Sequence, residues 1–286
     1  IYIYIYGMCG PYDIVDFLSE IYEKNGSQDL IGAARPSIAD PFLPIKISEG
    51  RIEDIRECIG CNICYAHDSL GVPIRCTQNP TMGEEWRFGW HPEKIKKKQS
   101  PKRFLVVGAG PSGLEAARVL GEQGNEVILA EATRNLGGRV IKESNLLGLA
   151  EWRRVSDWRI TQINKLSNVE IYRESELVAK DVTELNADFV MIATGAKWSE
   201  DALGRHSDTG FETVDTNMII GAEHVLNGEK IDGDRIVIYD DDHYYIGSVM
   251  ALELSRRGHS VVLVTPAGRA CSWGAVSYTH LRAHET

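Results

Sequence analysis

A glycine-rich turn between a short apolar run and a helix constrains the fold of this chain more than any other feature. The apolar run Phe104–Val107 is typical of a buried strand, and it leads directly into Gly108–Gly113, with the sequence GAGPSG. A helix is predicted from Pro111 to Glu122, followed by a second strand, Val127–Ala130, that ends at Glu131. This order of elements predicts a Rossmann-like unit with a parallel sheet, and therefore an α/β fold.

Each glycine of this turn has a physical task in binding a phosphate. Gly108 permits the tight turn, Gly110 lets the backbone approach a pyrophosphate, and Gly113 allows helix and strand to pack closely. The helix N-terminus adds N–H groups and positive partial charge. Glu131 is placed to accept a hydrogen bond from an adenosine ribose hydroxyl. We therefore expect an ADP or FAD site; the alternative is a Rossmann turn that has lost its ligand.

Two further segments are expected to border this nucleotide. Gly137–Gly138–Arg139 continues the unit, as flavin-binding members of the class often do. Phe189–Ala193 is predicted to be another buried strand, and it ends in Thr194 and Gly195. Small residues there would let the backbone lie against the nucleotide, although a plain turn at a strand end has the same composition. Arg139, Thr194 and Gly195 are therefore candidate cofactor-binding residues.

A second Rossmann-like unit is predicted from Arg235 onward, but its phosphate loop has changed. Its elements would be a strand over 236–239, a helix over 248–257 and a strand over 261–264. In place of the three glycines it has Asp240, Asp242 and Tyr245. Like charges about 4 Å apart at an effective dielectric constant of ~20 repel by roughly 4 kcal/mol. We expect this unit to keep the fold and to have lost the nucleotide.

Four cysteines form an independent pattern. Cys58, Cys61 and Cys64 follow one another at intervals of three residues, and Cys76 comes twelve positions later. Four thiolates can bind one iron–sulfur cluster, and Gly60 would let the backbone curl so that successive sulfurs converge. A four-cysteine zinc site uses the same ligands, although zinc ribbons usually separate two CxxC pairs. We favour a cluster over zinc and over unligated cysteines, and all four are candidate metal ligands.

The segment before the cysteines predicts a helix and then a buried strand. The helix would span 13–24, and the apolar run Asp29–Ala34 is typical of a strand buried on both faces. Arg35 follows that strand, where barrel enzymes place ligand-binding residues. The alternative is a structural pair with a carboxylate such as Asp40. The prolines at 36, 41 and 44 predict an irregular connector.

Both ends of the chain differ from the rest. Ile1–Tyr6 (IYIYIY) is what an alternating adenine–thymine repeat encodes, and 275–286 is unpatterned and resembles a translated sequencing adaptor. We expect both to be foreign to the fold, with a buried barrel strand as the alternative for the first. The chain would then be a fragment of a longer protein.

The composition excludes some partners. The formal net charge of −10 argues against nucleic acid, which selects basic surfaces, and gives no support for docking on an anionic membrane. The sequence contains no apolar run of about 18 residues, so no membrane span is predicted. Its first residues contain no basic region, so no secretory signal is predicted. Cysteines used as thiolate ligands fit a reducing compartment, and we expect a cytoplasmic protein.

Taken together, the motifs resemble one family. CIGCNIC (58–64), the stretch 76–94 and GAGPSG are similar to the trimethylamine and histamine dehydrogenases, and DLIGAARPSIADPFLP (29–44) resembles the end of their flavin barrel. The resemblance covers 28–264. It implies a (β/α)8 barrel with FMN, a 4Fe-4S cluster and a glutathione-reductase-like nucleotide-binding region. The FMN phosphate would be held by Arg35, the cluster by the four cysteines, and ADP by Gly108, Gly110, Gly113 and Glu131.

The resemblance also implies an activity. A small amine would be oxidised by hydride transfer to FMN, and the electrons would pass through the cluster to an electron-transferring flavoprotein; a homo-oligomer is expected. The family's flavin-attaching cysteine and substrate residues lie in the earlier barrel, so no catalytic residue is assigned and the fragment alone is expected to be inactive. Arg154 replaces the family's electron-relay tyrosine, and the loop between Cys64 and Cys76 is shorter than in trimethylamine dehydrogenase.

Two alternative functions remain open. One is an NADPH-dependent 2,4-dienoyl-CoA-type reductase, which would need a working second phosphate loop. The other is a non-catalytic module that binds a cluster and a nucleotide. The domain organisation predicted is a barrel end at 1–50, a cluster segment and linker at 51–100, an ADP- or FAD-binding domain at 101–228, the degenerate unit at 229–274 and a non-native tail at 275–286.

Overall fold

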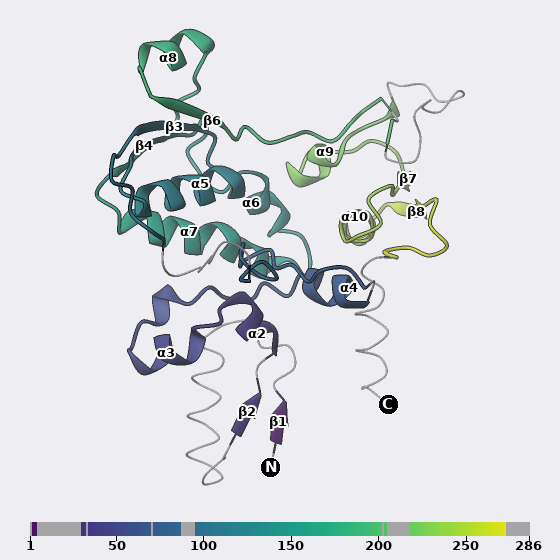
Figure 1. The fold of residues 1–286 in the computed structure, drawn as a ribbon. Helices are drawn as coiled ribbons and strands as arrows, with labels where there is room; N and C mark the ends of the chain where they lie inside the picture. Colours follow the sequence, from purple (N-terminus) through teal and green to yellow (C-terminus); the bar gives the residue numbers. More distant parts are fainter. Residues whose placement is uncertain are drawn as a thin grey trace. The chain divides into compact units, whose positions relative to one another are not determined.

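The chain is described by a computed structural model that covers residues 2–4, 30–32, 34–69, 71–86, 95–201, 203–204 and 218–272, with the backbone alone for 2–4, 30–32 and 69 (Figure 1). It divides into two compact units, and each is described by itself. The first comprises Ile1–Cys61, Pro73–Ile141 and Glu151–Gly195, and the second Asn62–Val72, Lys142–Ala150 and Ala196–Thr286.

The first unit is built on a parallel sheet of four strands in the order β5-β4-β3-β6. The strands are β3 (Arg103–Val107), β4 (Glu126–Ala130), β5 (Val169–Tyr172) and β6 (Phe189–Ile192). Because β4 and β5 are added on one side of β3 and β6 on the other, the strand order reverses between β3 and β6. Open α/β sheets bind ligands at such a switch point, outside the carboxyl ends of the strands. The predicted α/β fold class is confirmed.

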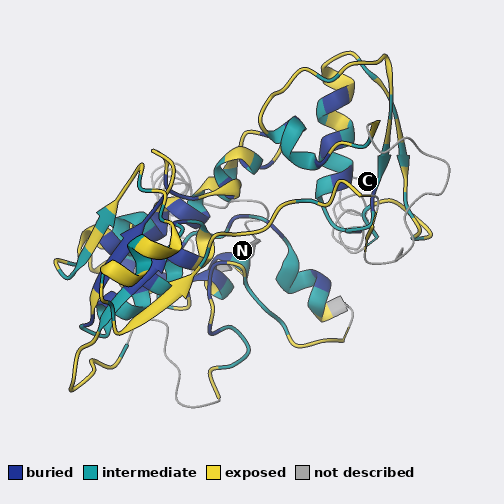
Figure 2. Cartoon of the chain, turned by 90° about the horizontal axis from the view of Figure 1, so that it is seen from above, coloured by how far each residue is buried: buried dark blue, intermediate teal, exposed yellow. Residues whose placement is uncertain are grey.

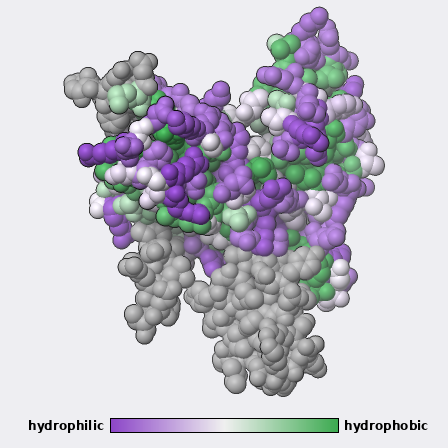
Figure 3. Space-filling model, turned by 180° about the vertical axis from the view of Figure 1, so that it is seen from behind, coloured by the Kyte–Doolittle hydropathy of each residue, from purple (hydrophilic) through white to green (hydrophobic). Residues whose placement is uncertain are grey.

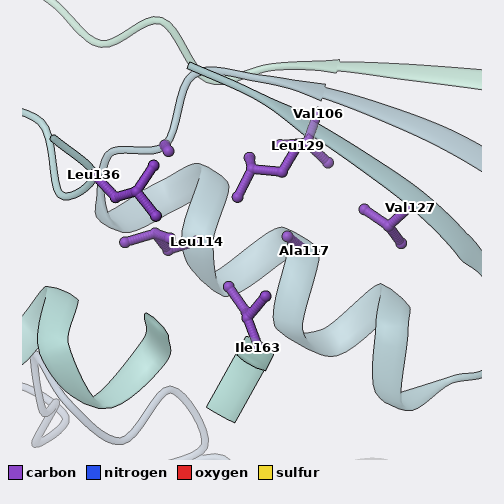
Figure 4. Packing of buried hydrophobic residues seen from close by; sticks show 8 residues of the cluster. Val106, Leu114, Ala117, Val127, Leu129, Leu136 and Ile163 are labelled. Atoms are coloured by element: carbon purple, nitrogen blue, oxygen red, sulfur yellow. The ribbon is translucent and has the colours of Figure 1, made fainter. Parts of the chain in front are cut away.

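Helices α5 (Pro111–Glu122) and α7 (Arg154–Asn164) form the core together with this sheet. One buried cluster combines Leu114 and Ala117 on α5 with Val106 and Leu129 on the sheet and Ile163 on α7 (Figure 4). All five are essentially inaccessible to solvent, and such burial stabilises a fold by about 1.5–3 kcal/mol per large apolar side chain. Figure 2 colours the buried stretches of the chain dark blue. The remaining helices of this stretch are α6 (Arg139–Glu143), η2 (Ala150–Arg153) and α8 (Ala179–Glu184).

The described residues of the N-terminal part begin with a pair of strands. Strand β1 (Tyr2–Tyr4) pairs in parallel with β2 (Leu30–Gly32), which agrees with the strand alternative for the first residues. The predicted proline connector instead forms helices α2 (Ala34–Ala39) and α3 (Leu43–Ser48), followed by η1 (Ile52–Asp54). The reason is that Pro36 and Pro44 lie in first turns, where a helix needs no N–H. The helix predicted over 13–24 lies outside the described residues.

The second unit contains the predicted second βαβ segment. Strand β7 (Arg235–Tyr239) pairs in parallel with β8 (Ser260–Val264), and α10 (Ile246–Arg256) connects them. Helices α4 (Ile63–Ser69) and α9 (Ala222–Leu226) belong to the same unit. Figure 3 shows mainly hydrophilic side chains (purple), with apolar ones (green) between them, over the described surface turned toward the viewer. None of the described helices combines the length and apolar composition needed to cross a bilayer. The tail at 275–286 is outside the described residues.

Candidate functional site

The first candidate site lies at the switch point of the four-stranded sheet. The turn Gly108–Gly113 follows β3 and the segment Thr194–Gly195 follows β6, so both lie at the carboxyl ends of neighbouring strands. The backbone at Gly108 has φ +99°, and a Cβ there would overlap the carbonyl oxygen of Ala193. Glycine is therefore required at this position, as predicted for the tight turn.

Gly110 and Gly113 differ in what surrounds them. A Cβ at Gly113 would overlap the carbonyl oxygen of Gly108, so α5 packs against the turn with no room for a side chain. A Cβ at Gly110 would meet no atom within 4 Å. Gly110 is the N-cap of α5, and Pro111 occupies the first helical position. The space beside Gly110, at the N-terminus of α5, therefore suits a pyrophosphate.

Glu131 is buried at the end of β4 and already accepts three hydrogen bonds. Its Oε2 accepts from the backbone N–H of Ala109 at 2.8 Å. Its Oε1 accepts from the N–H and the hydroxyl of Thr133 at 2.9 and 2.8 Å. Because a carboxylate has about four acceptor positions, capacity remains for a ribose hydroxyl.

The loop that ends in Arg139 also reaches the glycine turn. Gly137 donates its N–H to the carbonyl oxygen of Ala109 at 2.8 Å. A Cβ at Gly138 would lie 3.0 Å from the Cα of Gly110. Arg139 comes next, as the exposed first residue of α6. The loop thus lies against the turn, and its cation is accessible to an anionic ligand.

Thr194 and Gly195 are accessible and lie beside the turn. The Cα of Thr194 is 3.2 Å from where a Cβ of Gly108 would be, and both residues are exposed. The expected burial of the preceding strand is wrong. Met191 on β6 is 40% exposed and Ile192 is 78% exposed, because β6 is the edge strand of the described sheet.

Arg35 lies apart from this turn, in the first turn of α2 just after β2, and it is half-buried. This position agrees with the predicted placement at a strand end. Asp40, considered as a structural partner, accepts from Nζ of Lys46 at 2.7 Å and from the N–H of Arg56 at 2.8 Å. These two donors help to fix the Asp40 carboxylate.

In the second unit, the changed phosphate loop is filled by its own carboxylate. Asp240 is buried, and its Oδ1 accepts from the N–H groups of Asp242 and His243, both at 3.2 Å. Gly247, in the first turn of α10, is so close that a Cβ would lie 2.5 Å from Cγ of Asp240. An anion of the protein thus occupies the helix N-terminus where a phosphate would bind.

The four cysteines are divided between the two units. Cys58, Cys61 and Cys76 belong to the first unit, whereas Cys64 lies on α4 in the second. Gly60 adopts φ +67°, so the expected curl of the backbone between the cysteines is present. Within the residues that the structure describes, no three Cys, His, Asp or Glu side chains approach closely enough to hold a metal ion.

The surroundings of the sulfurs nevertheless suit a bound cluster. Burial and nearby Cys61 raise the pKa of the Cys76 thiol and so disfavour its thiolate, whereas backbone N–H groups act in the opposite direction. The N–H of Gln78 points at Sγ of Cys76, and that of Gly60 at Sγ of Cys58, both at 3.4 Å. Amide N–H groups directed at sulfur stabilise the thiolate charge of cluster ligands. The donor set and its hydrogen bonds therefore fit iron–sulfur chemistry.

A group of residues next to the cysteines was not identified from the sequence. Gln78 donates its Nε2 to the carbonyl oxygen of Glu57 at 3.0 Å, and its Oε1 accepts from Arg159 at 2.9 Å. Arg154, singled out as a departure, pairs with Glu57 at 3.3 Å. The weak signal in the sequence was position: Gln78 and Glu57 lie within two residues of cysteines. Arg159 is 81 residues from its partner, and no local pattern could indicate it.

Comparisons with known proteins give consistent similarities. Residues 79–226 match the family model described as pyridine nucleotide-disulphide oxidoreductase. The chain is 44% identical over 253 residues to dimethylamine dehydrogenase from Hyphomicrobium sp. (strain x), covering 86% of this chain and 34% of the relative. It therefore spans about a third of the length of the curated relatives it matches.

Two solved structures have the same fold over nearly all of this chain. Histamine dehydrogenase from Rhizobium sp. 4-9 is 46% identical with a TM-score of 0.86. The 6-hydroxypseudooxynicotine amine oxidase from Pseudomonas geniculata N1 is 43% identical with a TM-score of 0.87. Each similarity covers 94% of this chain and 40% of the other.

Proposed function

Because this chain belongs to the trimethylamine and histamine dehydrogenase family and has a pyridine nucleotide-disulphide oxidoreductase domain, we propose that it is the cofactor-binding part of an iron–sulfur flavoprotein amine dehydrogenase. The proposal rests mainly on two features that occur together in the first unit. One is a set of cysteine sulfurs to which backbone N–H groups point. The other is a glycine turn with open space at Gly110.

The residues of the turn would bind an adenosine diphosphate group, as ADP or as part of FAD. Gly108 and Gly113 fix the backbone, Gly110 would leave room for the pyrophosphate, and Glu131 would accept a hydrogen bond from the ribose. Arg139, Thr194 and Gly195 would border the same ligand. This assignment is supported by the location of the turn at the sheet's switch point.

Cys58, Cys61, Cys64 and Cys76 would hold a 4Fe-4S cluster, and Arg35 would bind the phosphate of FMN. When bound, the flavin would accept a hydride from the amine, and the cluster would take up its electrons singly. The residues of this chain would position these groups and shield them from water. A small amine is the proposed substrate, an electron-transferring flavoprotein the acceptor, and a homo-oligomer in the cytoplasm the working form.

The filled second loop supports this function over the reductase alternative. A dienoyl-CoA-type reductase must bind NADPH, whereas Asp240 already occupies the N-terminus of α10. A carboxylate there opposes an incoming phosphate by charge and by volume. The βαβ segment formed by β7, α10 and β8 would therefore have a structural role.

The test uses the full-length protein purified without air. We expect about four iron atoms per chain, an EPR signal after reduction, and reduction of a dye by a small amine such as dimethylamine or histamine. One tightly bound zinc and no iron would rule out the cluster. Bleaching of the flavin by NADPH, with no response to amines, would favour the reductase.

A further inference from the structure

Three guanidinium groups surround one buried tryptophan in the first unit. The guanidinium carbons of Arg56, Arg118 and Arg159 lie 4.5, 5.3 and 5.9 Å from the ring centroid of Trp158. The three arginine residues are 1%, 3% and 4% exposed, and Trp158 is 8% exposed. Cation–π attraction favours such contacts, and more so where water is excluded. We call these three residues the arginine layer.

The arginine layer concentrates positive charge. Glu115 accepts from Arg118 at 2.6 Å and from Arg159 at 2.8 Å, while Glu122 accepts from Arg118 at 2.7 Å. Burial lowers the pKa of Arg159; Glu115 opposes this, while Arg56 and Arg118 lower it further. The two neighbouring guanidiniums thus repel that of Arg159, despite the carboxylate between them. Buried charges are costly unless they are paired, and Glu115 and Glu122 supply two carboxylates beside the three guanidiniums of the layer.

The layer is connected to the cysteine segment through Gln78. Nη1 of Arg159 donates to Oε1 of Gln78 at 2.9 Å, and Nη2 donates to its carbonyl oxygen at 3.4 Å. The N–H of the same glutamine points at Sγ of Cys76 at 3.4 Å. Arg56 precedes Cys58 by two residues in the chain. Arg159 is therefore linked to the sulfur of Cys76 through Gln78, and Arg56 adjoins the cysteine motif in sequence.

We propose that the arginine layer sets the reduction potential of the iron–sulfur cluster, with Arg159 as a positioning residue that acts through Gln78; this inference rests on the proposed function. Each electron that enters a cluster adds one negative charge. Buried cations and N–H groups directed at sulfur stabilise the reduced form and raise the potential. Arg159 contributes in both ways, because it is a cation and it orients the glutamine whose N–H faces Cys76.

The test compares two variants of the full-length holoenzyme, purified without air. Arg159→Gln removes the charge but keeps a donor for Gln78, whereas Arg159→Lys keeps the charge. We expect the glutamine variant to bind iron normally and to lower the ratio of reduced to oxidised cluster, at a fixed potential, by about tenfold. That change equals a shift of ~59 mV for a one-electron couple. The lysine variant should lie close to the wild type in an EPR-monitored redox titration.

Further variants separate the possible outcomes. Arg56→Gln removes a second cation of the layer and should shift the potential in the same direction, which keeps the test decisive if Arg159→Gln does not fold. Equal potentials in wild type and both glutamine variants, at full iron content, would overturn the inference and leave the proposed function standing. Absence of iron from the wild type would overturn the proposed function itself. Equal shifts in Arg159→Gln and Arg159→Lys would indicate a purely structural role.

Discussion

The backbone N–H of Ala109 donates to the carboxylate of Glu131 at 2.8 Å, so the phosphate turn and the acid predicted to bind ribose are directly bonded. The two parts of the nucleotide site, at the ends of β3 and β4, are therefore held in a fixed relation. A change at Glu131 should affect both the ribose contact and the geometry of the turn.

Glu131→Gln should weaken ADP binding by about 10- to 100-fold, since a charged hydrogen bond contributes roughly 1.5–3 kcal/mol. The glutamine would also turn an amide donor toward groups that are themselves donors. Calorimetric titration of the nucleotide-free protein with ADP measures the effect. Glu126→Gln, on the exposed opposite end of β4, is the matched control and should bind ADP like the wild type.

Gly110→Ala should mainly lower the affinity for ADP, whereas Gly113→Ala should mainly lower the stability of the fold. The first methyl would enter open space, so the unfolding temperature should stay the same while ADP affinity falls by at least about tenfold. The second would strike the Gly108 carbonyl oxygen, and overpacking of this kind costs roughly 1–3 kcal/mol. Thermal unfolding and ADP titration of both variants provide the comparison. Unchanged ADP binding by Gly110→Ala would contradict the placement of the pyrophosphate.

Asp240→Ala should destabilise the second unit without creating a coenzyme site. The substitution leaves the N–H groups of Asp242 and His243 without their acceptor, a loss of about 1–2 kcal/mol. Asp241 and Asp242 still oppose a phosphate. Urea unfolding measures the first effect and NADPH titration the second, with Asp232→Asn at an exposed site as control. Tight NADPH binding by the wild type would refute the assignment.

Glu115→Gln should change how stability depends on pH. Burial opposes ionisation of Glu115, but Arg118 and Arg159 overcome this and hold the pKa of its carboxyl below the usual 4.5. A lowered pKa in the folded state adds stability above about pH 4.5, and this contribution is lost as the pH falls through the folded value. The variant should be less stable by about 3–5 kcal/mol at pH 7, with a flatter acid limb. Unfolding free energies from pH 7 to 3 test this, with Glu122→Gln as the more exposed comparison.

Replacing any one of the four candidate ligands by alanine should lower the iron content of the anaerobically purified protein by more than half. The variants are Cys58→Ala, Cys61→Ala, Cys64→Ala and Cys76→Ala. Removing one of four ligands leaves a coordination site that water or thiol must fill. Cys271→Ala should retain full iron, because its position is unrelated to the motif. Iron and acid-labile sulfide analysis measures both results, and full iron in Cys64→Ala would show that the ligand set is different.

Local signals explain what could be predicted from the sequence. The strands around Gly108–Gly113 are short apolar runs, and the glycines mark their turn, so β3, α5 and β4 were located closely. Helix α7 was not predicted, because its buried face includes Ser156 and Arg159 rather than an apolar stripe. Ser156 donates to the carbonyl oxygen of Arg153, whereas Arg159 finds remote partners in Gln78 and Glu115. Sequence periodicity has no means of detecting such pairs.

Other differences have equally specific causes. Pro36 and Pro44 predict irregular backbone when read from the sequence, but a proline in a first helical turn costs nothing. The apolar run 189–192 predicted a covered strand, whereas an edge position leaves it exposed. The cysteine motif predicts the ligands and their chemistry. It does not predict that Arg56 and Arg159, which are far apart in the sequence, both lie over the ring of Trp158.

The position of Asp240 against α10 affects how strongly a dissolved phosphate could compete for this site. A tethered carboxylate is present at an effective concentration that a free molecule in solution rarely reaches. Any dissolved phosphate must compete with an occupant that cannot diffuse away. The second βαβ unit therefore blocks its own phosphate position, because the Asp240 side chain is covalently part of the chain and always present.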